Sequence, residues 1–394
     1  MSRSSILLTV AGRDAPGIAG RLFGTLAPVG LPVLDVEQVQ VHGRLLLCVE
    51  LAGGPGDADR LQATLDRDPS WTGSDLRVSL EVLPSAAVKH DRARYLVTVL
   101  GADLGPGVLA GIFGRLAGAG ANVDRIVRLA DYPVTSYELT VSGGDPDRFR
   151  RDLGAEAARQ GVDVAVQAAG LHRRAKHLIV LDADSTLLQG EVIDLLAART
   201  GHADRVAAVT AAAMAGEIDF ADALRDRVAL LGGIEESVLD DVRRDLRLAP
   251  GARTLVRTLR RLGYVTAVVS GGFVQVIEDL VVTLGIDHLA ANTLEIESGR
   301  LTGRLVGPVI DRPGKAEALV RFAGLAGVPL GRTIAVGDGA NDLDMLAAAG
   351  LGIAFNAKPL VREAADTSLS VPYLDAVLFL LGISREEIEA ADDR

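Results

Sequence analysis

An internal repeat in the amino-terminal part of the chain limits the possible folds more than any other feature. The apolar run at residues 6–10 is followed by Asp14-Ala15-Pro16-Gly17 and a helical stretch. After Tyr95 the same order returns, with the longer loop Asp103-Leu104-Gly105-Pro106-Gly107. Each copy continues with two strand patterns, a helix and a last strand, which predicts a ferredoxin-like βαββαβ module. We expect the two modules to span residues 1–84 and 94–168.

The rest of the chain, residues 176–394, has a different pattern. Continuous apolar runs at 177–181, 264–269 and 333–336 alternate with helical stretches. Such runs are typical of central strands in a parallel sheet, so this part is predicted to be an α/β, Rossmann-like domain. Residues 191–248 show only helical periodicity. We expect them to form a helical cap, inserted after the first strand.

Composition and charge exclude several functional classes. Hydrophobic residues make up 48% and charged residues 24%, as in a globular protein, and the net charge of −11 argues against nonspecific binding to nucleic acid or an anionic membrane. No run is long enough for a membrane-spanning helix and no signal peptide is evident, so a cytoplasmic location is expected. The single cysteine, Cys48, lies in an apolar run and is predicted to be a buried thiol rather than a metal ligand.

Two aspartates follow the first strand of the predicted α/β domain, in Asp182-Ala183-Asp184-Ser185-Thr186. In open parallel sheets, ligands bind beyond the carboxyl ends of the strands. One carboxylate there can attack phosphorus, and the second can protonate the leaving oxygen and later activate water. Taken alone, the same residues are equally typical of a helix cap.

Polar motifs also follow the next two strands. Ser270-Gly271-Gly272 offers a hydroxyl and unhindered backbone N–H groups to a phosphate. Gly337-Asp338-Gly339-Ala340-Asn341-Asp342 offers carboxylates that can join Asp182 around a hard divalent cation. Lys315 can neutralise charge between a phosphate and Asp182. Each motif alone is also compatible with a turn, a cap or a surface charge.

Together and in this order, the motifs resemble those of the haloacid dehalogenase superfamily. The resemblance implies that Asp182 is the nucleophile, that Asp184 is the proton donor and that Lys315 is catalytic. It also implies a Mg²⁺ ion held by the side chains of Asp182 and Asp338 and the backbone carbonyl of Asp184. Asp342 is expected to orient these ligands from a second shell.

A narrower resemblance concerns the substrate. The stretch from Asp182 through Glu191, the segment 214–220 and Arg227 are similar to phosphoserine phosphatases. The resemblance implies hydrolysis of O-phospho-L-serine through an aspartyl-phosphate, the last step of serine biosynthesis. Glu191 would meet the substrate ammonium, Arg227 its carboxylate, and Ser270 and Gly271 its phosphoryl group. Asn341 would either contact the phosphate as well or position Lys315. The residues expected to close over the substrate are Met214 and Phe220.

The amino-terminal modules resemble ACT domains, which often bind amino acids between paired subunits. The resemblance implies a regulatory amino acid, with serine as the expected ligand, at Asp14 and Gly17 and at Asp103 and Gly107. It also implies a homodimer. The extra residue in the second loop leaves open whether both copies bind ligand. Two such modules before a phosphatase domain resemble the actinobacterial form of the enzyme.

Two other functions stay open at the level of sequence. A relative could apply the same chemistry to another small phosphomonoester, as a phosphatase or a phosphotransferase. The chain could also be an amino-acid sensor with a vestigial catalytic domain, although Asp182, Asp184, Lys315, Asp338 and Asp342 are all present. A pump-type ATPase shares the aspartyl-phosphate chemistry but needs membrane spans, which we do not expect here.

Overall fold

The computed structural model has two compact units, residues 1–92 and 93–394. Within them it describes residues 4–72, 75–84, 94–170, 176–214 and 218–392. None of the helices in these ranges is long and apolar enough to cross a membrane.

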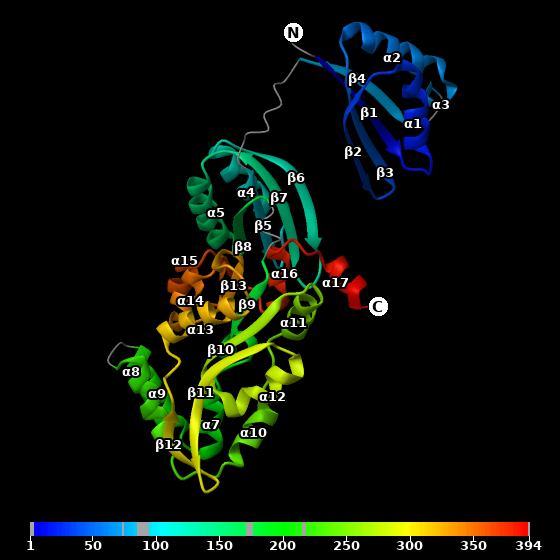
Figure 1. The fold of residues 1–394 in the computed structure, drawn as a ribbon. Coiled ribbons are helices and arrows are strands. Elements are labelled where there is room, and N and C mark those ends of the chain that lie inside the picture. Colours follow the sequence, from blue (N-terminus) through cyan, green and yellow to red (C-terminus); the bar gives the residue numbers. More distant parts are fainter. Residues whose placement is uncertain (1–3, 73–74, 85–93, 171–175, 215–217, 393–394) are drawn as a thin grey trace. The chain divides into compact units, whose positions relative to one another are not determined.

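The first unit is a single ferredoxin-like module (Figure 1). Its antiparallel sheet has the order β2-β3-β1-β4. Alternate residues of β1, Ile6, Leu8 and Val10, point into the core and pack with Leu22 and Leu61 of the two main helices. Its elements are β1 (Ser5–Arg13), α1 (Ile18–Leu26), β2 (Val33–Val41), β3 (Arg44–Ala52), α2 (Pro55–Arg67), α3 (Pro69–Thr72) and β4 (Arg77–Leu83).

The second unit begins with another module of this kind, whose sheet has the equivalent order β6-β7-β5-β8. The fold predicted from the repeat is therefore confirmed. Its elements are β5 (Arg94–Gly101), α4 (Pro106–Gly118), β6 (Ala121–Ala130), β7 (Thr135–Gly143), α5 (Pro146–Gln160) and β8 (Asp163–Ala168).

The extra loop residue changes how the first helix of the second module begins. In the first module Gly17 caps α1 in the left-handed region, at φ 91°, a conformation that favours glycine. In the second module Gly105 is the capping residue, with φ −63°, and Gly107 already lies in the first turn of α4. The two loops thus present different backbone geometry to any ligand.

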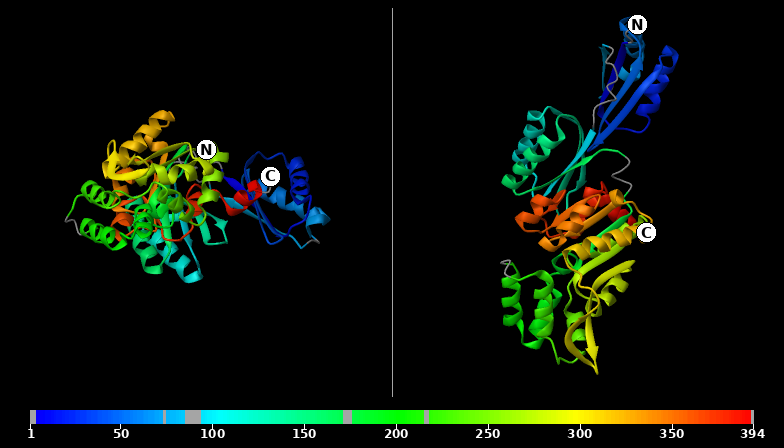
Figure 2. Two further views of the ribbon diagram at one scale, coloured as in Figure 1. Left: turned by 90° about the horizontal axis from the view of Figure 1, so that it is seen from below. Right: turned by 60° about the vertical axis from the view of Figure 1, so that its left-hand side comes forward.

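The α/β core contains a seven-stranded sheet of order β12-β11-β10-β9-β13-β14-β15, in which β9 is central (Figures 1 and 2). Helices cover both faces of this sheet. The strands are β9 (Leu178–Asp182), β10 (Val265–Phe273), β11 (His288–Glu297), β12 (Arg300–Val306), β13 (Thr333–Gly337), β14 (Gly352–Phe355) and β15 (Thr367–Leu369). The helices of the α/β core are α11 (Ala252–Arg261), α12 (Val274–Leu284), α13 (Arg312–Leu325), α14 (Leu343–Ala348), α15 (Pro359–Ala364), α16 (Val377–Leu380) and α17 (Arg385–Asp392).

Between residue 191 and α11, within the interval where the sequence predicts a cap, the described residues form four further α-helices. They are α7 (Val192–Thr200), α8 (Ala203–Met214), α9 (Phe220–Ala229) and α10 (Val238–Asp245).

The antiparallel hairpin β11–β12 was not predicted. Its turn residues Ser298 and Gly299 both have positive φ, 52° and 73°, as a two-residue hairpin turn requires. The Ser-Gly pair was the sequence signal for it.

Candidate active site

The order of the strands brings the predicted motifs together. Asp182, the last residue of β9, is aligned with Val269 of β10, and Leu181 is aligned with Val336 of β13. Ser270 and the Gly337-Asp338 pair therefore emerge on either side of Asp182 at the carboxyl edge of the sheet. This edge is where a doubly wound fold binds ligands.

Lys315 lies between two carboxylates at the centre of the site. Its Nζ donates to Asp182 Oδ1 at 2.5 Å and to Asp342 Oδ1 at 2.7 Å, and the three side chains are at most 2% exposed. Burial opposes the charge of Lys315, but Asp182 and Asp342 outweigh it and raise the pKa of the lysine. Burial and the charge of Asp342 raise the pKa of Asp182, against the effect of Lys315. The site thus gathers more negative charge than its lysine balances.

Three carboxylates at this edge could hold a metal ion. Ligand oxygens of Asp182, Asp338 and Asp342 all lie within 4.8 Å of one another. Burial, followed by the charge of Asp342, raises the pKa of Asp338 to about 6. A cluster of carboxylate oxygens with too little positive charge beside it fits a hard divalent cation, which supplies the missing charge. Gly337 is needed here, because a Cβ atom would lie 2.4 Å from the Asp342 carboxyl carbon.

Asp184 is turned back toward the sheet edge by a short helical turn, η2 (Ala183–Leu187), in which Ser185 has a left-handed backbone at φ 56°. Its Oδ1 accepts from the Val192 N–H at 2.8 Å, and its Oδ2 accepts from Ser270 Oγ at 3.0 Å. Burial raises the pKa of Asp184, although these two hydrogen bonds oppose the shift. The Gly272 N–H in turn donates to Ser270 Oγ at 2.8 Å.

The cap contributes two opposite charges. Arg227 on α9 is 8% exposed, and its guanidinium donates only to neutral oxygens: to Ala223 O at 3.3 Å and to Thr210 Oγ1 at 3.4 Å. No carboxylate in the described part of the chain lies within ion-pair distance of it. Burial lowers the pKa of Arg227, and the charge of Glu191 is the main opposing effect.

Glu191 immediately precedes α7, and the carboxylates of the site shift its pKa. Desolvation, followed by the charges of Asp184 and Asp338, raises the pKa of Glu191 to about 7, while Arg227 acts in the opposite direction. Met214 and Phe220, predicted to close the pocket, have side chains that lie outside the described residues.

The residue that sequence reasoning missed is Asn292 on β11. Its side chain is 2% exposed, donates through Nδ2 to Gly271 O at 2.9 Å and accepts through Oδ1 from the Ile310 N–H at 2.8 Å. It therefore ties the Ser270-Gly271 loop to the segment that leads into α13 and Lys315. No local motif marks it; its position two strands from Asp182 becomes visible only in the folded sheet.

The residues predicted to bind a regulatory amino acid lie elsewhere, at the first loops of the two modules. Asp14 Oδ2 accepts from Gln40 Nε2 at 2.8 Å, and Gly17 caps α1. Asp103 precedes α4, and Gly107 lies inside that helix.

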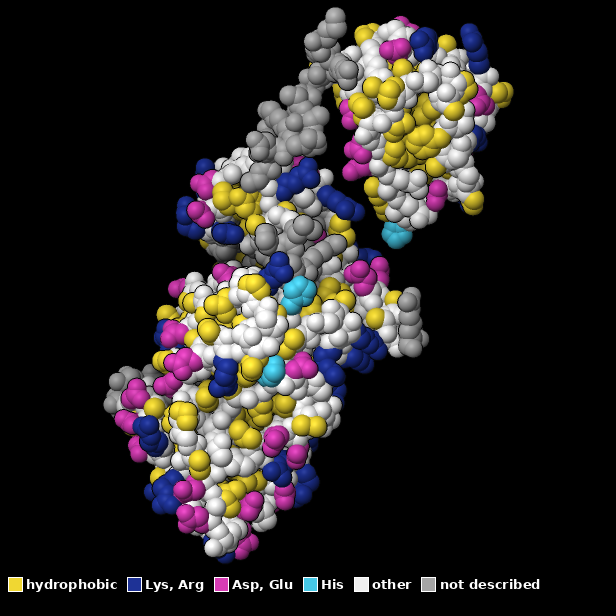
Figure 3. Space-filling model, viewed as in Figure 1, with side chains coloured by type: hydrophobic (Ala, Val, Ile, Leu, Met, Phe, Trp, Pro, Cys, Tyr) yellow, Lys and Arg dark blue, Asp and Glu magenta, His cyan; other side chains and the backbone are white. Residues whose placement is uncertain are grey.

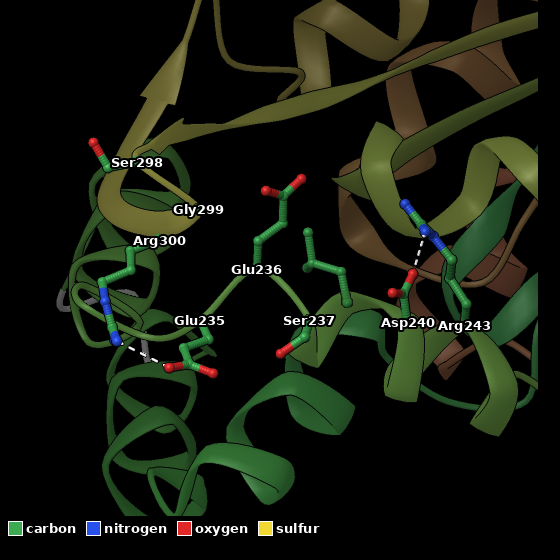
Figure 4. A pocket seen from close by; sticks show the side chains of 9 residues that line it. Glu235, Glu236, Ser237, Asp240, Arg243, Ser298, Gly299 and Arg300 are labelled. Atoms are coloured by element: carbon green, nitrogen blue, oxygen red, sulfur yellow. Dashed lines mark hydrogen bonds and ion pairs between the residues drawn. The ribbon is translucent and has the colours of Figure 1, made fainter.

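A hollow of about 470 Å³ lies at the outer end of the cap and the β11–β12 hairpin (Figure 4). Its two arginines are paired, Arg300 with Glu235 at 2.9 Å and Arg243 with Asp240 at 2.6 Å. It contains none of the predicted site residues, and we do not assign the substrate to it.

Comparison with known families agrees with this geometry. Residues 179–347 match the haloacid dehalogenase-like hydrolases, and residues 4–79 and 93–167 each match an ACT domain family. Haloacid dehalogenase-like phosphatases use a divalent metal, and the aspartate cluster is compatible with one.

Similar proteins extend over nearly the whole chain. The phosphoserine phosphatase of Streptomyces coelicolor is 55% identical over 391 residues, which cover 98% of this chain and 94% of that protein. That of Mycobacterium tuberculosis is 51% identical over 393 residues, covering 99% and 96%.

A solved structure of a probable phosphoserine phosphatase from Vibrio cholerae is 34% identical, with a TM-score of 0.59, and covers 77% of this chain and 89% of its own. A phospho-aspartyl intermediate analogue of a phosphoserine phosphatase is 39% identical, with a TM-score of 0.50, covering 52% and 98%. The chain therefore belongs to the phosphoserine phosphatase family of the haloacid dehalogenase-like hydrolases, with two ACT domains at its amino terminus.

Proposed function

We propose that this protein hydrolyses O-phospho-L-serine to L-serine and phosphate, with Asp182 as the nucleophile. The observation that carries the proposal is the buried cluster at the end of β9, in which Asp182 lies 2.5 Å from Lys315 and beside Asp338 and Asp342. Full-length relatives named phosphoserine phosphatase support the substrate.

In the first step a carboxylate oxygen of Asp182 attacks phosphorus. The bond from phosphorus to the serine oxygen breaks, and Asp184 gives its proton to that oxygen. A raised pKa suits this role, because it keeps a proton on Asp184 when the substrate arrives. Ser270 Oγ and the Gly271 N–H are proposed to hold phosphoryl oxygens, together with Lys315 and Asn341.

In the second step Asp184, now ionised, takes a proton from water. The water oxygen bonds to phosphorus, and the bond from phosphorus to Asp182 breaks, which regenerates the carboxylate and releases phosphate. Lys315 remains beside Asp182 throughout and compensates the change of charge on its oxygen. The cap must exclude water in the first step and admit it in the second.

The side chains of Asp182 and Asp338 and the Asp184 carbonyl are the proposed ligands of Mg²⁺. The ion would supply positive charge to the phosphoryl oxygens and favour ionised Asp182. Asp342 is proposed to act behind them, since its two oxygens already accept from Lys315 and from the Gly339 N–H.

Selectivity for an amino-acid phosphate is proposed to come from the cap. A buried guanidinium without an ionic partner is costly, and a substrate carboxylate would satisfy it through two parallel hydrogen bonds. Glu191 would bind the substrate ammonium, which also favours the ionised form of the glutamate.

The ACT modules are proposed to bind an amino acid, serine first among the candidates, and to pair in a homodimer. In the first module, β2 is the edge strand of the described sheet, paired with β3 on one side only, and it is exposed along its whole length. Large exposed hydrophobic side chains of this strand include Val33, Leu34, Val39 and Val41, and Figure 3 shows hydrophobic side chains gathered on this module. Exposed apolar edge strands commonly mark interaction sites. The predicted cytoplasmic location stays a prediction.

A phosphate-release assay tests the proposal. Phosphoserine, phosphothreonine and an aryl phosphate are compared with and without Mg²⁺ and serine. We expect Mg²⁺-dependent release, fastest from phosphoserine. A preference for the aryl phosphate would favour a different phosphomonoesterase, and no release from any of the three would favour a sensor with a vestigial catalytic domain.

A further inference from the structure

The second ACT module and the α/β core enclose a cavity of about 930 Å³ that the proposed reaction does not use. One wall is formed by α5 and β8, and the other by α15, β15 and the turns at Gly331 and Gly350. Figure 1 shows α5 and β8 beside α15. We call this space the junction cavity.

Hydrogen bonds close to the cavity hold its two walls together. The Ser370 N–H, just after β15, donates to Asp163 Oδ2 at 2.6 Å, and Gln167 Nε2 of β8 donates to Leu380 O at 2.8 Å. Both walls belong to the same compact unit. The cavity is thus a built part of the unit, within the range of volumes typical of small-molecule sites.

The lining is positively charged, although the chain as a whole carries −11. The cations are Arg150, Arg151, Lys176 and Arg362, against the two anions Glu363 and Asp366. Such a local excess in an acidic protein concentrates anions.

Most of these cations are available to a ligand. In the part of the chain that the structure describes, neither Arg151 nor Arg362 forms an ion pair, and Arg150 has only a long contact of 3.8 Å with the exposed Asp147. Lys176 is 6% exposed, and its Nζ donates to a neutral oxygen, Gly331 O, at 2.6 Å. Asp366, also in the lining, acts on the charge of Lys176 without forming an ion pair with it in the described part of the chain, so the buried ammonium can still take an anion in direct contact.

A second, independent observation concerns Thr367 on β15. This residue lines the cavity and is 5% exposed, and its hydroxyl has no hydrogen-bond partner among the described residues. A buried hydroxyl left unsatisfied costs free energy that a polar ligand atom would recover.

We propose that the junction cavity binds a small organic anion with phosphate or carboxylate groups, held by Arg151, Arg362 and Lys176 and by the Thr367 hydroxyl. The guanidinium groups suit both kinds of anion, because each presents two parallel N–H donors. The anion contacts the second ACT module and the core at once, so its binding stabilises their docked arrangement. Lys176 is two residues before β9, the strand that ends in Asp182. This site does not depend on the proposed reaction.

Calorimetry on the full chain in metal-free buffer of constant ionic strength tests the site. Pyrophosphate and citrate serve as probes, one for phosphate and one for carboxylate chemistry. We expect at least one of them to bind, and the stronger one identifies the ligand class. Binding should weaken about tenfold or more in Arg151→Glu and in Arg362→Glu, since each loses a charge-assisted contact.

Two further variants keep the test decisive. Arg148→Glu makes the same change of charge on an exposed part of α5 outside the cavity lining and should leave binding within about twofold. Thr367→Val nearly preserves shape and should weaken binding several-fold. The site is refuted if neither probe binds, if Arg151→Glu and Arg362→Glu bind as the parent does, or if Arg148→Glu weakens binding equally. The second outcome would place the anion elsewhere on the protein.

Discussion

The phosphoryl end and the cap end of the proposed substrate site each contain a buried cation, but the two cations differ in whether a carboxylate of the protein pairs with them. At the phosphoryl end, Lys315 is buried between Asp182 and Asp342, so this cation has two carboxylate partners in the protein. At the cap end, Arg227 is 8% exposed, and among the described residues it donates only to neutral oxygens. This difference indicates that the phosphoryl end performs the reaction and that the cap end recognises the substrate. The paired end is preorganised for a reaction, whereas the unpaired end is completed by the substrate.

Removal of the nucleophile should have the largest effect. Asp182→Asn keeps the shape of the side chain but cannot form the aspartyl-phosphate. We expect kcat for phosphoserine to fall by about 10⁴-fold or more. Steady-state phosphate release measures it, and circular dichroism checks that the fold is kept. Residual activity within about a hundredfold of the parent would refute Asp182 as the nucleophile.

Removal of the unpaired cation should have the next largest effect, and one that depends on the substrate. In Arg227→Ala the substrate carboxylate loses its partner, at a cost of about 2–4 kcal/mol, or roughly 30- to 700-fold in kcat/KM. An aryl phosphate, which lacks the carboxylate, should be affected far less.

Arg225→Ala is the matched control for this change. Arg225 lies on the same helix, α9, but is exposed and paired with Asp222 at 2.7 Å. We expect no more than about a twofold change for either substrate. Equal losses on both substrates in Arg227→Ala would remove its role in recognition.

Removal of the Asn292 side chain, which connects the Ser270-Gly271 loop to the segment before α13, should have an intermediate effect on activity. Asn292→Ala breaks two buried hydrogen bonds that position Ser270-Gly271 and Lys315, so we expect kcat to fall about tenfold with little change in KM. Asn292→Asp keeps the acceptor for the Ile310 N–H but sets a carboxylate against Gly271 O, and should be no better.

Gln275→Ala controls for stability alone. Gln275 also makes two hydrogen bonds to the backbone of β11, both to Leu294, but does not connect the two catalytic segments. A similar loss of kcat in Gln275→Ala would reduce the role of Asn292 to general stability.

The smallest effect concerns pH at the cap end. The pKa of Glu191 is raised to about 7, so the side chain gains a proton, and loses its attraction for the substrate ammonium, as pH falls through that value. KM for phosphoserine should therefore rise several-fold on acidification, with the inflection moved to lower pH by bound Mg²⁺. Glu191→Gln should have a raised KM with a flatter pH profile. An unchanged inflection in this variant would assign the titration to another group.

The same contrast explains what the sequence could predict. Asp182, Ser270 and Asp338 come at or just after the ends of apolar runs in the sequence. Adjacent parallel strands bring such residues to one edge, so the phosphoryl end was accessible from sequence. Arg227 lies on the helix α9 and Glu191 just before α7, where a charge looks like any surface charge, and only the family resemblance selected them.

Other features could not be predicted because they depend on long-range contacts. Asn292 contacts backbone groups 21 and 18 residues away, and its role follows from the pairing of β10 and β11. The junction cavity is formed by two domains, and none of its residues belongs to a motif. The hairpin β11–β12, by contrast, had a local signal in Ser298-Gly299.

The most direct measurement of the central claim is the position of the covalent phosphate. The full-length protein with Mg²⁺ is mixed with phosphoserine labelled in its phosphate, quenched in acid within a single turnover, digested and analysed by mass spectrometry. The account predicts that the label appears on the peptide containing residue 182, decays as phosphate is released, and is absent from Asp182→Asn. Serine release without any covalent label, or a label on another residue, would contradict it.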